Sequence, residues 1–183
     1  LLNRFRQVHP HIEIKLHTGD PDKAITRILD GVEEITIAAR PVSMHKGLAF
    51  TPITKSPLVF IAPVEQQPNV PTTSPASKSD WERVPMILSE GGVSRIRVDD
   101  WFSEQNITPN IYAQVAGNEA IVSMVSLGFG IGVVPKIVLD NSPLMDRVQI
   151  LDVQPELEPY DIGLFTLKKS LKNPLVEAFW ALV

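Results

Sequence analysis

The sequence predicts an α/β protein. Short apolar strands and amphipathic helices follow one another in the order strand, helix, strand in the first third of the chain. The same alternation resumes in the second half, where glycine and proline bound the segments. Hydrophobic residues make up 44% of the 183 residues, enough to build a sizeable core. We therefore expect helices layered on a mainly parallel sheet.

The first third opens with an apolar helix face, on which Leu1, Leu2, Phe5 and Val8 recur at helical spacing. A second helix is expected from Asp20, its N-cap, to Gly31, which lies just past its end. Strands are expected over 12–18, where apolar residues alternate strictly, over 35–41 and over 57–63.

The segment 63–80 is rich in proline and poor in core-forming side chains, which predicts an exposed connection between two lobes. Beyond it, strands are expected over 85–89, 111–117, 130–135, 147–153 and 160–169, and helices over 94–105, 118–127 and 173–183.

Three glycines at every second position interrupt the second of these helices and open the next strand. Gly128 suits the left-handed position that ends a helix. Gly130 and Gly132 allow another backbone or a ligand to approach closely. Tight helix–sheet packing and the wall of a ligand cleft both explain this pattern.

Composition and motifs exclude several function classes. A net charge of -4 argues against a nucleic-acid-binding surface, and the absence of cysteine excludes disulfides and fits the reducing cytoplasm. No apolar run is long enough for a membrane span, and no signal peptide is visible. Catalytic signatures are absent, so neither an enzyme nor a cofactor or metal is expected. The histidines fit turn or surface positions, and Asp99, Asp100 and Glu104 fit a solvated helix face.

Two helix starts offer sites for an anion. Gly92 and Ser94 open one helix, and Gly117 and Asn118 open another, so unpaired N–H groups and positive dipole ends suit a carboxylate. Ordinary N-capping, with Asn118 as the cap of the second helix, is the alternative explanation of each start. Because both helices follow strands of one lobe, both are expected at the carboxyl edge of its sheet, where α/β proteins bind ligands. Arg40 and Lys55, near strand ends of the other lobe, either face this site or are surface cations.

The blocks "LLNRFRQVHPHIEIKLHTGD", "NEAIVSMVSLGFGIGVVPKIVL" and "NPLVEAFWALV" resemble the effector-binding domain of LysR-type transcriptional regulators, and the resemblance covers essentially the whole chain. It implies a two-lobed, type 2 periplasmic-binding-protein-like fold, with mixed sheets flanked by helices and hinge strands at 57–63 and 161–169. Lobe one would comprise 1–64 and 163–183, and lobe two 65–162.

The resemblance also implies what precedes residue 1: a winged helix-turn-helix, a linker helix, and a lobe-one strand with a polar loop that often touches effector. Part of the effector site would then lie outside this sequence. Carried over by position, the residues expected to bind effector are Ala39, Arg40, Lys55, Ser56, Gly92, Ser94, Gly117, Asn118, Gly130 and Ile131.

The implied partners are a small carboxylate effector, a second copy in a homodimer (a tetramer for the full-length regulator), DNA through the preceding domain only, and RNA polymerase, which such a regulator can contact. Within the family, "NEAIVSMVSLG", "LDNSP" and "PLVEAFW" resemble a branch that acts in branched-chain amino acid synthesis, which implies acetolactate and acetohydroxybutyrate as effectors. The alternatives are a periplasmic solute-binding protein for a small carboxylate, which predicts an upstream signal peptide, and an enzyme on the same scaffold.

Overall fold

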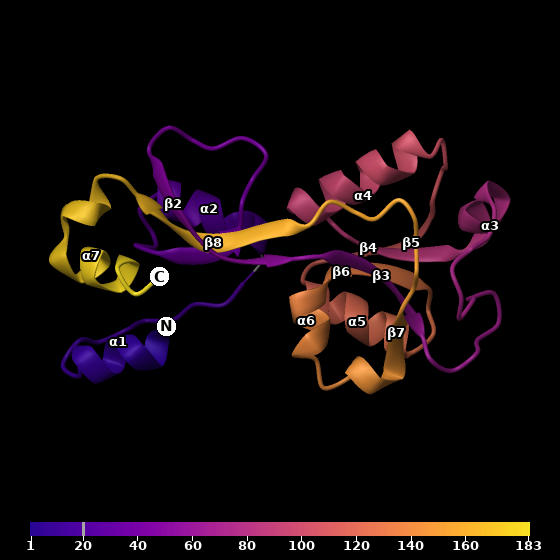
Figure 1. The fold of residues 1–183 in the computed structure, drawn as a ribbon, viewed down its shortest axis with the longest axis horizontal. Helices are drawn as coiled ribbons and strands as arrows, with labels where there is room; N and C mark the ends of the chain where they lie inside the picture. Colours follow the sequence, from indigo (N-terminus) through magenta and orange to yellow (C-terminus); the bar gives the residue numbers. More distant parts are fainter. Residues whose placement is uncertain (20) are drawn as a thin grey trace. The chain divides into compact units, whose positions relative to one another are not determined.

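The computed structural model describes residues 1–19 and 21–183 (Figure 1). Its contacts divide the chain into two compact units, unit 1 (Leu1–Lys55 and Asp161–Val183) and unit 2 (Ser56–Tyr160). The helices are α1 (Leu2–Val8), α2 (Pro21–Leu29), α3 (Lys78–Arg83), α4 (Gly92–Glu104), α5 (Asn118–Ser126), α6 (Lys136–Asp140) and α7 (Pro174–Trp180). The strands are β1 (Thr36–Ala39), β2 (Leu48–Ser56), β3 (Leu58–Pro63), β4 (Pro85–Ser89), β5 (Asn110–Val115), β6 (Ile131–Pro135), β7 (Val148–Ile150) and β8 (Tyr160–Leu167). Within these described ranges, every helix is too short or too polar to cross a bilayer.

Unit 1 is built on a three-stranded sheet in the order β1-β8-β2. β1 and β8 pair antiparallel, with Thr36 opposite Phe165, and the Phe165 side chain is fully buried. Helix α1 packs through Phe5, whose ring centroid lies 5.2 Å from that of Phe179 in α7. The expected apolar face of α1 is therefore only partly used, because Leu2 and Val8 remain exposed.

Local sequence signals end α2 and begin α3 and α7, although no helix was expected at α3. Gly31 takes a φ of +70° after α2, and the side chain of Asn173 accepts a hydrogen bond from the N–H of Leu175 to cap α7. In α3 a capping box joins Ser77 and Asp80. The expected N-cap of α2, Asp20, lies outside the described residues.

The strand expected over 12–18 is wrong. The segment has no regular structure, and Leu16 is 67% exposed. A strand needs a neighbour to take its backbone hydrogen bonds, and among the described residues no strand of the sheet pairs with this segment. The segment contacts the rest of unit 1 through a hydrogen bond between His17 and Glu33, in which His17 Nδ1 lies 3.0 Å from Glu33 Oε1. The sequence also missed β2, whose middle residues are exposed and include a proline.

Unit 2 is built on a five-stranded sheet in the order β5-β4-β6-β3-β7. β4 pairs parallel with both β5 and β6, whereas β3 pairs antiparallel with β6 and β7. The sheet is therefore mixed, as the family resemblance implied, and not mainly parallel, as strand and helix order alone suggested. α5 packs on this sheet through Ile121, Val122 and Val125, all fully buried.

The segment 63–80 belongs to unit 2 and does not connect two units. Val70 is 3% exposed, and the Ser74 hydroxyl donates a hydrogen bond to the carbonyl oxygen of Asp152. The chain passes between units at Lys55–Ser56 and at Tyr160–Asp161, whereas the resemblance implied divisions after residues 64 and 162. As a result β3, expected as a hinge strand, lies inside the sheet of unit 2.

The glycine run after α5 is explained by packing. Gly128 takes a φ of +81°, and the N–H groups of Gly128 and Phe129 donate to the carbonyls of Val125 and Met124, which is a Schellman ending. A Cβ on Gly132 would lie 2.5 Å from Ile121 Cγ2 in α5, and a Cβ on Gly130 would clash with the carbonyl oxygen of Pro85. Close packing therefore accounts for both later glycines, against β4 at Gly130 and against α5 at Gly132.

Candidate functional site

Three helices begin at one edge of the unit 2 sheet. β4 and β5 are parallel, with Ser89 opposite Val115 at their carboxyl ends, and α4 and α5 begin within three residues of these positions. β6 is parallel to β4 and leads directly into α6 at Lys136. This carboxyl edge is where helix starts converge in α/β proteins, and the sequence predicted it for α4 and α5.

Glycines, and not the polar residues beside them, form the N-caps at this edge. Gly91 is the N-cap of α4, and Gly117, with a φ of +84°, is the N-cap of α5. Asn118 is the first helical residue, so the expectation that it caps α5 is wrong, and so is a capping role for Ser94. Among the described residues no side chain accepts a hydrogen bond from the first turn of either helix. These N–H groups therefore keep their capacity to bind an anion.

The two polar side chains differ in accessibility. Ser94, in the first turn of α4, is only 6% exposed, and Asn118 is half-buried at the start of α5. Gly92 takes a φ of +78°, which keeps this turn free of a side chain. The first turn of α4 thus presents mainly backbone, and the start of α5 presents an amide.

Ser56 lies at the same edge but has a structural partner. Its hydroxyl accepts a hydrogen bond from the N–H of Ile137 at 3.1 Å and donates to the carbonyl oxygen of Pro57 at 3.3 Å. The Pro57 carbonyl also accepts from the N–H of Lys136. The end of β2 and the residue after it therefore cap α6, and the Ser56 side chain is buried.

Gly130 and Ile131 do not join this group. Ile131 pairs with Met86 at the amino end of β4, so both residues lie at the opposite edge of the sheet from Gly92 and Asn118. The Ile131 side chain is fully buried.

The three expected residues of unit 1 lie near one another. Ala39 ends β1 opposite Ile162, and the next residue, Arg40, donates its backbone N–H to the carbonyl oxygen of Asp161 at 2.7 Å. The Arg40 guanidinium lies 5.3 Å above the Phe50 ring. Lys55 is exposed, with Nζ 4.0 Å from Asp161 Oδ1. Arg40 and Lys55 are the two cations of this group.

Arg95 brings a cation to the carboxyl edge that the sequence analysis missed. Its guanidinium donates to the carbonyl oxygen of Ser89 at 3.1 Å and to the side chain of Gln114, and its Nε lies 2.8 Å from Asp99 Oδ1. The side chain is 18% exposed. The spacing of Arg95 and Asp99, one helical turn apart, was the available signal.

Two acids have lowered pKa values: the Arg27 hydrogen bond lowers the pKa of Glu33, and the Ser77 hydroxyl hydrogen bond lowers the pKa of Asp80. Within the described ranges, no group of three or more histidine or acidic side chains is placed to hold a metal ion.

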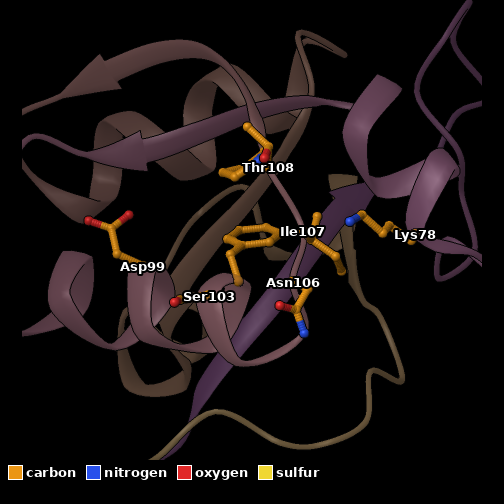
Figure 2. Close-up of a pocket in the computed structure, with 8 residues that line it drawn as sticks. Lys78, Asp99, Ser103, Asn106, Ile107 and Thr108 are labelled. Carbon is orange, nitrogen blue, oxygen red and sulfur yellow. The ribbon is translucent and has the colours of Figure 1, made fainter.

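Two surface hollows lie on unit 2. One, of about 530 Å³, is open to solvent, and Figure 2 shows Lys78 of α3 facing the turn at Asn106 and Ile107. This turn precedes β5, so the hollow lies at the amino edge of the sheet. The second, of about 450 Å³, lies between α5 and α6 and includes Glu119, whose exposed carboxylate in the first turn of α5 opposes an anionic ligand there. The start of α4, which has no acid in its first turn, is therefore the best candidate for carboxylate binding.

The chain matches the model of the LysR substrate binding domain over residues 1–183. It is 40% identical over 186 residues to the HTH-type transcriptional activator IlvY of Salmonella typhimurium, a regulator and not an enzyme; the match covers 100% of this chain and 63% of that relative. Among solved structures, the regulatory domain of Synechocystis PCC6803 CcmR in complex with 2-PG has a TM-score of 0.81 at 20% identity, covering 99% of this chain and 86% of that one. The effector-binding domain of QuiR in complex with shikimate has a TM-score of 0.74 at 24% identity, covering 97% and 84%. This chain belongs to the LysR substrate-binding domain family.

Proposed function

We propose that this chain is the effector-sensing domain of a LysR-type transcriptional activator, and that a small carboxylate binds at the carboxyl edge of the unit 2 sheet. One observation carries the location: α4 and α5 begin there from glycine N-caps, and no described side chain occupies their first-turn N–H groups. By contrast, α3 and α7 are capped by Ser77 and Asn173. Uncapped helix starts beside Arg95 favour a bound anion.

For the effector we propose acetolactate or acetohydroxybutyrate, on the 40% identity to IlvY. Each is a 2-hydroxy-2-alkyl-3-oxo acid. The carboxylate suits the N–H groups of the α4 start together with the Ser94 hydroxyl and the Asn118 amide, the hydroxyl and ketone suit further N–H groups at the helix starts, and the alkyl group needs an apolar wall. Arg40 and Lys55 are the alternative carboxylate partners.

The whole protein's activity follows as a proposal from the relative, since this chain spans 63% of its length. DNA binding would belong to a preceding helix-turn-helix domain in a cytoplasmic regulator of branched-chain amino acid synthesis, because the net charge of -4 here opposes phosphate contact. A homodimer, and a tetramer of the full-length regulator, complete the proposal. A periplasmic solute-binding protein is the less favoured reading, because the curated relative of 40% identity is a regulator.

Calorimetric titration with two matched ligands tests the proposal. Acetoin is acetolactate without its carboxylate, so the two differ in the group that the helix starts are proposed to bind. We expect acetolactate to bind at least about tenfold more tightly than acetoin, the value of one charge-assisted hydrogen bond. Equal affinity for the two ligands, or no binding of acetolactate, would contradict the proposed effector chemistry.

A further inference from the structure

The segment that leads out of unit 2 is held by one helix. Residues 151–159 between β7 and β8 contain no helix or strand, and the chain enters unit 1 at Tyr160–Asp161. Trp101 of α4 donates its indole N–H to the carbonyl oxygen of Pro155 at 2.7 Å. The same indole packs in an aromatic cluster with Phe60, its ring centroid 5.1 Å away. The first half of the segment is thereby fixed to the core of unit 2.

Arg97 of α4 holds the second half. Its Nη1 donates to the carbonyl oxygens of Glu158, at 2.8 Å, and of Pro159. Its guanidinium carbon lies 5.3 Å from the centroid of the Tyr160 ring. A single side chain therefore contacts three consecutive residues directly before the chain leaves unit 2.

Stability alone is a weak reason for an arginine at this position. The Arg97 side chain is only 14% exposed, and its Nε is buried and has no hydrogen-bond partner in the described structure; the nearest carboxylate oxygen, on Glu158, is 3.5 Å away. An unsatisfied buried donor is costly, and apolar residues of similar size often replace buried ions without loss of stability. An apolar side chain would lack the guanidinium N–H donors, which here reach two carbonyl oxygens at once.

The same face of α4 continues to its first turn. Ser94, Arg97 and Trp101 are spaced by three and four residues, so they lie along one face of the helix, and all three are buried or nearly so. A helix of thirteen residues moves as a rigid element, so a displacement at Gly92 would also move the Arg97 contacts.

We propose that Arg97 is a positioning residue that couples the first turn of α4 to the strand β8 at its entry into unit 1. An effector bound at the start of α4 then alters how firmly the segment 156–160 is held. This inference rests on the proposed function for the location of the effector, but the mechanical link between Arg97 and the segment is testable without any ligand.

Hydrogen exchange of the unliganded chain tests the link. Arg97→Met removes the donors and keeps most of the apolar stem, and Glu104→Met, which removes an exposed charge from the last turn of the same helix, is the control. We expect amides within 156–162 to exchange about tenfold faster in Arg97→Met than in the wild-type chain, since lost hydrogen bonds ease local opening. Glu104→Met should leave these amides unchanged. Equal exchange in the two variants would overturn the proposal. If Arg97→Met does not fold, Arg97→Lys replaces it in the same exchange measurement, because lysine keeps the positive charge but lacks the branched guanidinium donors.

A second arm adds acetolactate. In the wild-type chain, saturation should change the exchange of 156–162, and in Arg97→Met this change should be lost while affinity stays within about threefold, because Arg97 does not contact the ligand. A ligand-induced change that persists in Arg97→Met would refute the coupling. Failure of the wild-type chain to bind acetolactate would count against the proposed effector. The comparison without ligand would still test whether Arg97 holds the segment 156–160.

Discussion

The Ser56 hydroxyl accepts a hydrogen bond from the backbone N–H of Ile137 across 3.1 Å. The two residues are 81 positions apart, and their contact lets the end of β2 cap a helix that lacks a capping residue of its own. The resemblance to LysR-type regulators placed Ser56 among the effector contacts. In unit 2 this side chain is buried, and its hydroxyl already makes hydrogen bonds with Pro57 and Ile137.

Ser56→Ala should therefore destabilise unit 2. Loss of a cap costs about 1 kcal/mol, and the N–H of Ile137 would lose its acceptor. Urea denaturation would measure the change in the free energy of unfolding. Ser103→Ala, on the exposed face of α4, is the control, for which we expect a change within about 0.5 kcal/mol. A Ser56→Ala variant as stable as this control would show that the cap contributes nothing.

Gly132→Ala should also destabilise the chain, through overpacking. The new Cβ would lie 2.5 Å from Ile121 Cγ2 and 2.8 Å from Val125 Cγ2, so α5 would have to move away from the sheet. Overpacking of this kind costs about 1–3 kcal/mol. Gly19→Ala is the matched control, because a Cβ there would meet no atom within 4 Å. Thermal melts of both variants would provide the comparison, and similar melting temperatures would contradict close packing at Gly132.

Asp80 should contribute stability that depends on pH. The Ser77 hydroxyl, and next the Arg83 guanidinium, lower its pKa from the ordinary value of 3.8. A carboxyl group whose folded pKa is lowered stabilises the fold above its unfolded pKa, and this contribution disappears as pH falls through the folded pKa. At neutral pH, Asp80→Asn should therefore have a lower free energy of unfolding than the wild-type chain. As pH falls below 3.8, its free energy of unfolding should decrease less than that of the wild-type chain. Asp100→Asn, on the solvent face of α4, controls for the removal of one carboxylate. Parallel stability profiles for Asp80→Asn and the wild-type chain would refute the prediction.

The exposed part of α1 predicts self-association. Phe5 packs inside unit 1, whereas Leu2 is 38% and Val8 is 65% exposed. We expect sedimentation at high micromolar concentration to give a species of twice 20.3 kDa, and Val8→Glu to shift it toward the monomer. Gln7→Glu adds the same charge at a polar position of the helix and should leave the dimer intact. A wild-type chain that sediments only as a monomer would contradict this interface.

The fold could be predicted from sequence where its signals are local. Gly31 and Gly128 both end helices with positive φ, and Asn173 caps α7 just before a proline. Strand pairing joins residues that are far apart in the sequence, and the errors in the predicted strands come from it. The residues of 12–18 alternate as in a strand yet have no ladder in the described structure, while β2 pairs with β8 despite its exposed middle. A polar/apolar pattern shows that a segment can form a strand, but the partner decides whether it does.

The residues of the candidate site were likewise predicted where the signal is local and missed where it is not. Because β4 and β5 each lead into a helix, their order in the sequence predicted that Gly92 and Asn118 would share an edge, and they do. The position of Ile131 depends on a register with Met86, and the role of Arg97 depends on a segment 61 residues away. Neither relation has a signal in the neighbouring sequence, so Ile131 was expected near Gly92 and Asn118, and the contacts of Arg97 were not foreseen.

Calorimetric titration of acetolactate into the wild-type chain and into a Ser94→Ala/Asn118→Ala double variant tests the central claim most directly. Neither residue is an N-cap, so the double variant should remain folded, which circular dichroism would verify. Loss of a charge-assisted hydrogen bond costs about 1.5–3 kcal/mol, so the account predicts binding that is about ten- to a hundredfold weaker. If the wild-type chain binds and the folded double variant binds equally well, the effector carboxylate does not sit at the starts of α4 and α5, and Arg40 or Lys55 holds it instead.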